Sequence, residues 1–268
     1  MSTVTLATVI SDLVAEQDAL DAIVAPLTAL DWELATPSPR WAIRDQIGHL
    51  AFFDETAALA ITNPEEFINH RSEFGKAAIE RPSADDELTL GAFRAMTADE
   101  LLTHWRHWRT QLAAAAASCG EKDRVEWYGP SMGAKSFLTA RLMEAWAHGQ
   151  DICDTVGSER EPTDRLRHIA QLGFITRGWT YINRKLEIPA GEVRVELSSP
   201  GGEIWTFGPD DAEAMVRGTA VDFCLVTTQR RNVADTALEI NGAAAQDWLD
   251  KAQLFAGPPS NPPDPRSD

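Results

Sequence analysis

Hydrophobic residues recur at helical spacing through the first two thirds of the chain. They lie three or four positions apart in several long runs, which places one apolar stripe on each amphipathic helix. The predicted helices cover residues 3–30, 41–62, 97–118, 133–156 and 166–182, with a shorter helix and a loop at Arg81, Pro82 and Ser83 in residues 64–96. Long amphipathic helices with short connections predict a helical bundle.

Several of these helices carry start and stop signals. Thr97 is followed three residues later by Glu100, the arrangement of a capping box, in which each side chain bonds the other residue's backbone N–H. Gly120 follows the end of this helix, and Gly157 follows the end of the next one. The signals support the predicted boundaries.

The pattern changes from helical spacing to alternation beyond Pro189. Residues 192–198 alternate between apolar and polar side chains, and residues 203–207 return as a second strand after a Pro-Gly-Gly turn. The elements predicted after this hairpin are a strand at 215–218, a helix at 220–228, a strand at 238–240 and a helix at 243–255. These segments predict a small α/β unit.

The two patterns together predict an α+β protein with two domains of unequal size. The helical bundle would cover residues 1–185 and the α/β domain residues 190–256, with the boundary near residues 185–191. Residues 257–268 contain five prolines, and we expect this tail to be disordered.

Charge and composition exclude several classes of partner. The chain has 24 Lys and Arg against 41 Asp and Glu, a net charge of −17, which argues against binding nucleic acid or an anionic membrane surface. The three cysteines form no paired motif. No apolar run approaches the about 20 residues that span a bilayer, and no basic leader begins the chain, so we expect a cytoplasmic protein. The sequence leaves open whether it is a monomer or a dimer.

Candidate metal ligands lie on two of the predicted helices. Glu144 and His148 are four residues apart, so their side chains project from one face and can share an ion such as Zn²⁺. This spacing alone is more typical of a solvated surface pair. His49, however, lies in an apolar run that faces the bundle interior, where a buried histidine requires a partner. The three side chains would converge if the two helices are neighbours.

Other polar candidates favour structural roles. His104 and His107 lie three residues apart between arginines, which is typical of an exposed polar face. Cys153 has no charged neighbour in the sequence that would lower the pKa of its thiol, so we expect it to pack in the core.

Two segments carry a resemblance to a known family. Residues 41–50, WAIRDQIGHL, and residues 144–151, EAWAHGQD, resemble the signature of the mycothiol-dependent maleylpyruvate isomerase group in the DinB-like superfamily. The resemblance implies a DinB-like four-helix bundle followed by a smaller, sterol-carrier-like α/β domain. It also implies that His49, Glu144 and His148 hold the metal, with Glu144 standing where many DinB-like proteins have a third histidine.

The resemblance also implies a chemistry. In this group an open-site divalent metal, usually taken to be zinc, activates the thiol mycothiol, because a metal-bound thiol loses its proton near neutral pH. The thiolate would add to the cis double bond of a small electrophilic substrate, the resulting single bond would rotate, and elimination would release the trans isomer. In an S-transferase the thiol would stay on the product.

Four further residues are assigned roles by this reading. Arg230 would grip a substrate carboxylate in a bidentate fork, unless it is a helix-end cation that faces water. Asp151 would orient His148, unless it is only a polar neighbour. Trp41 and Trp146 flank the proposed ligands in the sequence and would form walls of the thiol pocket.

Two rival functions fit the same ligands. One is a metal-dependent hydrolase, in which the open position activates water. The other is a non-enzymatic protein with a structural metal and an apolar ligand in its second domain. Metal analysis tests the premise that these functions share, and titration with mycothiol separates the thiol-dependent enzyme from the other two.

Overall fold

The computed structural model describes residues 4–81 and 85–266 of the chain. The chain divides into two compact units, Met1–Arg160 and Glu161–Asp268. The division falls earlier than the boundary predicted near residues 185–191, because the helices that begin at Leu166 pack on elements of the second unit. Pro82 and Ser83, where the sequence predicts a loop, lie outside the described residues.

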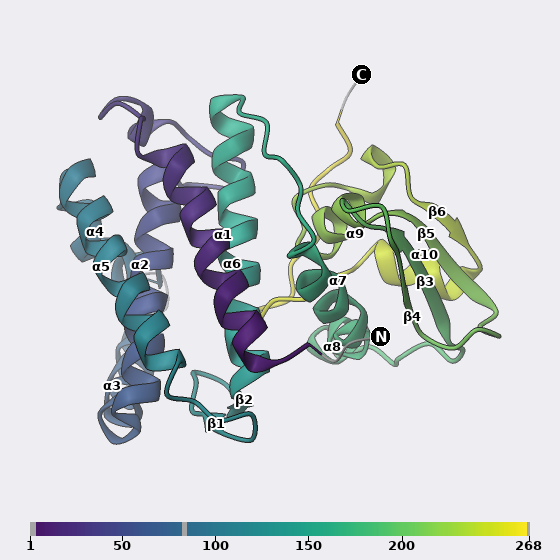
Figure 1. Ribbon diagram of the computed structural model, residues 1–268, viewed down its shortest axis with the longest axis horizontal. Coiled ribbons are helices and arrows are strands. Elements are labelled where there is room, and N and C mark those ends of the chain that lie inside the picture. The colour runs from purple at the N-terminus through teal and green to yellow at the C-terminus, as the bar shows by residue number, and fades with distance from the viewer. Residues whose placement is uncertain (1–3, 82–84, 267–268) are drawn as a thin grey trace. The chain divides into compact units, whose positions relative to one another are not determined.

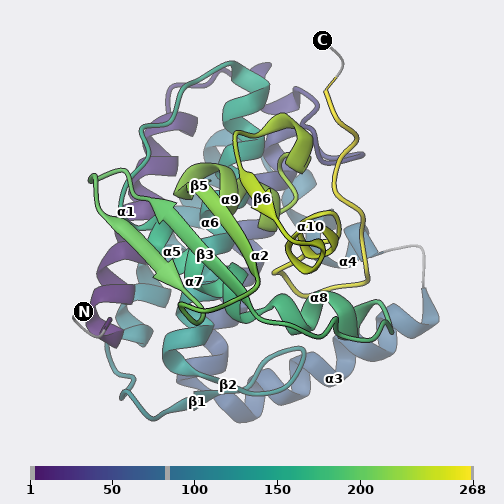
Figure 2. The same ribbon diagram turned by 90° about the vertical axis from the view of Figure 1, so that its right-hand side faces the viewer.

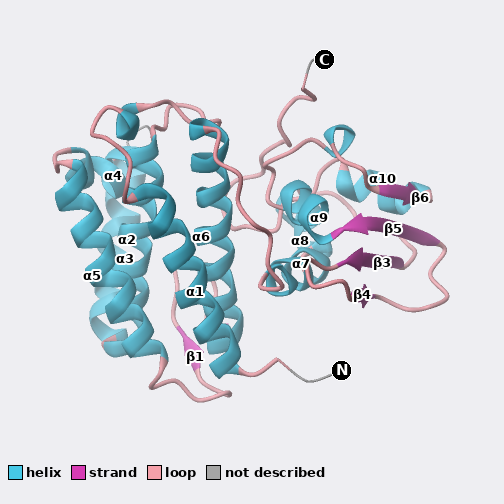
Figure 3. Ribbon diagram, turned by 45° about the horizontal axis from the view of Figure 1, so that its top comes forward, coloured by secondary structure: helices cyan, strands magenta, loops and turns pink. Residues whose placement is uncertain are grey.

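The first unit is a helical bundle with one short β-ladder. Its elements are α1 (Leu6–Val24), α2 (Ile43–Thr62), α3 (Pro64–Glu80), α4 (Asp85–Arg94), α5 (Ala98–Ala116), β1 (Arg124–Val125), β2 (Met132–Gly133) and α6 (Ala134–Val156). Figures 1 and 3 show α1, α2, α5 and α6 running alongside one another, and α2 contacts both α5 and α6. The bundle predicted from the helical spacing is thus confirmed.

One apolar cluster joins α2 to its neighbours. The side chains of Ile43, Ile47 and Leu50 form one stripe of α2 and pack with Trp105 of α5 and Ile152 of α6. Burial of each such side chain contributes about 1.5–3 kcal/mol, so the cluster fixes the rotation of α2 about its axis. The neighbouring stripe of the same helix carries His49.

The predicted helix signals have the expected geometry. Thr97 accepts a hydrogen bond from the backbone N–H of Glu100, and the Glu100 carboxylate accepts one from the N–H of Thr97, 2.8 Å away. Gly157 ends α6 in the left-handed conformation at φ 66°, where a side chain would be strained. Thus α5 begins and α6 ends where the local chemistry directs.

The second unit combines four helices with a four-stranded sheet among its described residues. Its elements are α7 (Leu166–Ile175), α8 (Arg177–Asn183), β3 (Val193–Ser198), β4 (Ile204–Phe207), β5 (Ala214–Thr219), α9 (Ala220–Thr227), β6 (Glu239–Asn241) and α10 (Ala243–Leu249). The strand order is β4-β3-β5-β6, as Figure 2 shows. The predicted hairpin is confirmed, with Val195 opposite Phe207, whereas β3 and β5 run parallel. The α+β class follows from both units.

Three details of the second unit differ from the predictions. The helix predicted over residues 166–182 is two helices that meet at Thr176, and the terminal helix ends at Leu249 rather than at residue 255. Residues 257–266 are not a disordered tail. Ser260 donates hydrogen bonds to the side-chain oxygens of Gln229 (2.7 Å) and Gln253 (3.0 Å), so polar side chains hold this proline-rich segment in place.

The cysteines and the helices agree with the remaining sequence expectations. Cys119, Cys153 and Cys224 are free thiols, and Cys153 is buried. Burial raises the pKa of the Cys153 thiol, which keeps it protonated near neutral pH. None of the described helices combines the length and the apolar character that crossing a bilayer requires.

Candidate metal centre

Helices α2 and α6 bring His49, Glu144 and His148 together. One potential ligand atom from each residue lies within 4.8 Å of the other two. Oε2 of Glu144 is 3.0 Å from Nε2 of His49 and 3.1 Å from Nε2 of His148. Two imidazole nitrogens and one carboxylate form the ligand set of a catalytic zinc site, in which the fourth position stays open. The donor set of this chain fits such an ion.

The ionisation of these groups suits metal binding. Burial, reinforced by the nearby His148, lowers the pKa of His49 to about 4. Burial by itself raises the pKa of Glu144, but hydrogen bonds to His148 and His49 and the charge of Arg141 outweigh it and hold this pKa well below the usual range. Near neutral pH, His49 is therefore neutral and Glu144 is ionised, which are the forms that coordinate a metal.

A chain of hydrogen bonds sets the tautomer of His148. The Thr36 hydroxyl donates to the backbone carbonyl of Trp41 (2.9 Å), so its oxygen accepts from the side-chain amide of Gln46 (2.8 Å). The amide oxygen of Gln46 then faces Nδ1 of His148 at 2.5 Å and accepts the proton there. Nε2, the other ring nitrogen of His148, faces Oε2 of Glu144 and is the nitrogen that remains for a metal. Gln46 thus performs the orienting role that metal-site histidines require.

Aromatic rings lie against the two histidines. The Trp41 ring stacks on His148 with a centroid distance of 5.8 Å and lies 5.2 Å from His49. The Phe53 ring lies 4.6 Å from His49. The indole N–H of Trp41 donates to Asp86 at 3.2 Å, which ties this ring to α4. Trp41 therefore lies beside both candidate histidine ligands.

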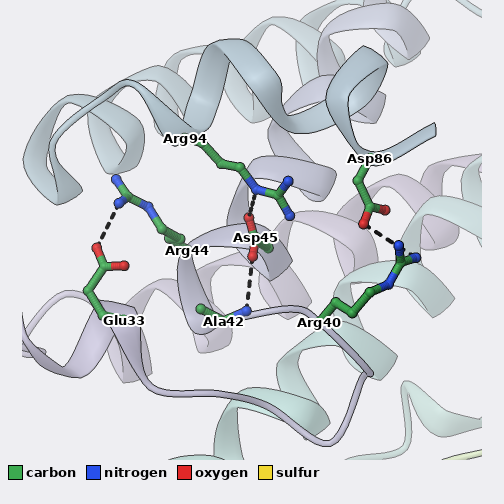
Figure 4. Close-up of a pocket in the computed structure, with 7 residues that line it drawn as sticks. All are labelled: Glu33, Arg40, Ala42, Arg44, Asp45, Asp86 and Arg94. Carbon is green, nitrogen blue, oxygen red and sulfur yellow. Dashed lines mark hydrogen bonds and ion pairs between the residues drawn. The ribbon is translucent and has the colours of Figure 1, made fainter. Parts of the chain in front are cut away.

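A polar cavity adjoins Trp41. It has a volume of about 490 Å³. Figure 4 shows that ion pairs cross it between α2, α4 and the loop before α2. The pairs are Arg44 with Glu33 (2.7 Å), Arg94 with Asp45 (2.7 Å) and Arg40 with Asp86 (3.4 Å). The cavity presents charges of both signs, so it suits a polar, hydroxylated ligand rather than an apolar one.

Three other sequence-predicted residues have the following contacts in the structure. Asp151 accepts a hydrogen bond from Ser38 at 3.0 Å, and Gln46 rather than Asp151 bonds Nδ1 of His148. Trp146 projects from the far side of α6, because residues two apart on a helix are rotated by about 200°, and it lies beneath Arg160 at 5.9 Å. Arg230 belongs to the second unit, where it donates to the carbonyl of Thr228.

Two residues of the centre are absent from the sequence-based predictions. Gln46 precedes His49 by three residues, and Arg141 precedes Glu144 by three, so each lies one turn from a ligand on the same helical face. This spacing is a signal that the sequence offers. His104, in contrast, pairs with Glu55 at 3.1 Å on a partly exposed face, in agreement with the surface role expected for it.

The fold and this centre define a class of protein. It is a helical-bundle protein whose facing helices bring two histidines and a glutamate together in a group that could hold one metal ion. Residues 13–153, more than half of the chain, match the family model described as the mycothiol maleylpyruvate isomerase N-terminal domain. The chain therefore belongs to the mycothiol maleylpyruvate isomerase family.

Individual relatives agree with this assignment. Two uncharacterized proteins from two strains of Mycobacterium tuberculosis are each 44% identical over 252 residues, which is 93% of this chain and 96% of the relative. Crystal structures of the mycothiol-dependent maleylpyruvate isomerase and of a mutant share the fold. The mutant has a TM-score of 0.60 at 15% identity, over 91% of this chain and 97% of that one. The other has a TM-score of 0.56 at 16% identity, over 86% and 92%.

Proposed function

We propose that the protein is a metal-dependent enzyme that uses mycothiol to isomerise, or to transfer sulfur to, a small electrophilic substrate that carries a carboxylate. The observation that carries this proposal is the set of three converging donor atoms in a chain of this family. His49, Glu144 and His148 would hold Zn²⁺ or another divalent ion. When bound there, such an ion supplies a thiolate near neutral pH by lowering the pKa of the thiol.

The residues around the centre have separate tasks in this proposal. Gln46 holds Nδ1 of His148, which leaves Nε2 free for coordination. Trp41 and Phe53 place apolar surface against the two imidazoles and shield them in part from water. Exclusion of water protects a thiolate from protonation and strengthens the electrostatic interactions at the site.

The polar cavity beside Trp41 supports the assignment of a hydrophilic thiol. Its arginines and carboxylates offer hydrogen-bond donors and acceptors within one cavity. Asp86 connects this cavity to the centre, because it accepts the indole N–H of Trp41 and also pairs with Arg40. A thiol whose sulfur reaches the metal could therefore place its polar portion in this cavity.

Metal analysis of the purified protein is the first test. We expect about one divalent ion per chain, and the ion should be lost in His49→Ala. His104→Ala is the matched control, because His104 also pairs with a glutamate, Glu55 of α2, but at a partly exposed position that contains no candidate ligand. A protein that retains its metal after His49→Ala would contradict the proposed centre.

Titration with mycothiol is the second test and separates the rival functions. Protein loaded with Co²⁺ should develop a thiolate-to-cobalt charge-transfer band when mycothiol is added, and turnover should depend on the thiol. A hydrolase would instead cleave ester or amide substrates without mycothiol, and a binding protein would show no turnover. Either result, or a missing charge-transfer band, would overturn the proposal.

A further inference from the structure

The guanidinium of Arg141 lies beside the candidate metal centre, and no described residue accepts a hydrogen bond from it. Arg141 is on α6, three residues before Glu144, and is 6% exposed. Its Nη2 is 3.9 Å from Oε2 of Glu144, too far for a hydrogen bond. Its Nη1 is buried and has no partner among the described residues. An arginine stays charged in a protein, so this is a buried cation with unused donors.

Two aromatic rings hold the guanidinium of Arg141 in place but offer it no hydrogen-bond acceptor. The guanidinium carbon lies 5.4 Å from the centre of the Phe53 ring and 5.6 Å from that of Trp127, both favourable for a cation on an aromatic face. Asp54, the other buried carboxylate nearby, uses Oδ2 to accept hydrogen bonds from Gln17 and Trp105. The rings orient a planar group whose polar edge still lacks an acceptor.

Such an arrangement is costly unless a ligand completes it. A buried donor without an acceptor lowers the stability of a protein by about 1–3 kcal/mol, and by more when the donor is charged. Glu144 does not remove this cost, because its Oε2 already faces both histidines. An anion that enters the centre from outside the chain would supply the missing acceptor.

We propose that Arg141 binds the carboxylate of the substrate while the reacting part of the substrate lies at the metal centre. The proposal rests on the proposed function, because the ligand reaches Arg141 through that centre. A planar carboxylate matches the fork of a guanidinium, and the flanking rings of Phe53 and Trp127 hold that fork in place. Arg141, in the first unit, thus takes the role that the sequence assigned to Arg230.

Binding of maleate to the cobalt-loaded protein tests this proposal. Maleate carries two carboxylates, and maleamide is its uncharged analogue of similar shape. We expect Arg141→Met to weaken maleate binding about 30-fold or more, as loss of a buried charged partner does, and to leave maleamide binding unchanged. Isothermal titration calorimetry gives both affinities. Methionine keeps apolar contact with the flanking rings and removes the buried charge, a change that folded proteins tolerate.

Three further variants serve as controls. Arg141→Lys keeps the charge without the fork and should recover part of the maleate affinity. Lys122→Met removes one exposed positive charge from the same unit and should leave the affinity unchanged. Arg230→Met tests the rival anchor. The charge-transfer band of the cobalt–mycothiol complex should persist in Arg141→Met, which shows that the centre is intact.

The outcomes distinguish the proposed role of Arg141 from the proposed metal centre. Maleate binding that survives Arg141→Met, or is lost only in Arg230→Met, would overturn the anchor and leave the proposed function standing. Loss of cobalt from both Arg141 variants would show that the guanidinium only supports Glu144, and would also overturn it. Wild-type protein that binds no cobalt would overturn the proposed function instead.

Discussion

Replacement of Gln46 tests whether the hydrogen bond to His148 prepares the metal centre. Gln46 is fully buried, and its amide oxygen is 2.5 Å from Nδ1 of His148. Gln46→Met removes the acceptor and keeps most of the side-chain volume. The N–H of His148 then has no partner, which costs about 1–3 kcal/mol. Loss of such an outer hydrogen bond typically weakens metal binding by about 10- to 100-fold, or about 1.4–2.7 kcal/mol, so the two magnitudes agree.

Competition with a chromophoric chelator for Zn²⁺ measures this affinity directly. Gln17→Met is the matched control, because Gln17 is an equally buried glutamine that bonds Asp54 rather than a ligand histidine. Gln46→Glu offers a second comparison, since a carboxylate also accepts the proton of Nδ1 and should keep the metal affinity at or above that of the wild type. Equal zinc affinities in wild type and Gln46→Met, or equal losses in both methionine variants, would refute the reasoning.

Two predictions concern the stability of the metal-free protein. Burial raises the pKa of Asp54 from 3.8 to about 6, so its stabilising contribution, up to about 3 kcal/mol, is complete at low pH and is lost as pH rises toward 6. Burial lowers the pKa of His49 from 6.5 to about 4, so stability is instead lost as pH falls through that window. These two effects oppose each other in the wild type. Urea unfolding of Asp54→Asn between pH 4 and 6.5 should therefore show a free energy of unfolding that rises with pH more steeply than in the wild type. An unchanged slope would contradict the raised pKa of Asp54. Gly157→Ala should cost about 1 kcal/mol because φ is 66°, whereas Gly133→Ala, at φ −62° with open space around it, should be nearly neutral in the same assay.

The fold could be predicted from the sequence wherever local chemistry determines it. Helical spacing, the capping box at Thr97 and the glycine at 157 located the long helices, and alternation located the hairpin. The parallel pairing of β3 with β5 and the division after Arg160 depend on contacts between distant segments, which no local pattern encodes. Ser260 shows the same limit, because its partners lie far from it in the sequence.

The metal centre was predictable in part for the same reason. Glu144 and His148 lie one helical turn apart, and the apolar run around His49 indicates that the side chain of His49 faces the bundle interior. Trp146 is close to the ligands in the sequence but differs from them in helical phase, so it lies on the other side of α6. Helical phase favours Gln46 and Arg141 instead, since each lies one turn before a ligand.

The charge of the whole chain and the charge of Arg141 at the centre have opposite effects on an anionic ligand. A net charge of −17 attracts divalent cations and repels anions at long range. Within a few ångströms the direction reverses, because Arg141 is buried among aromatic rings where its field is weakly screened. An anionic substrate would therefore be selected by contacts made at the centre rather than by attraction from a distance, so exchange of Arg141 should change affinity and substrate choice more than the rate of association.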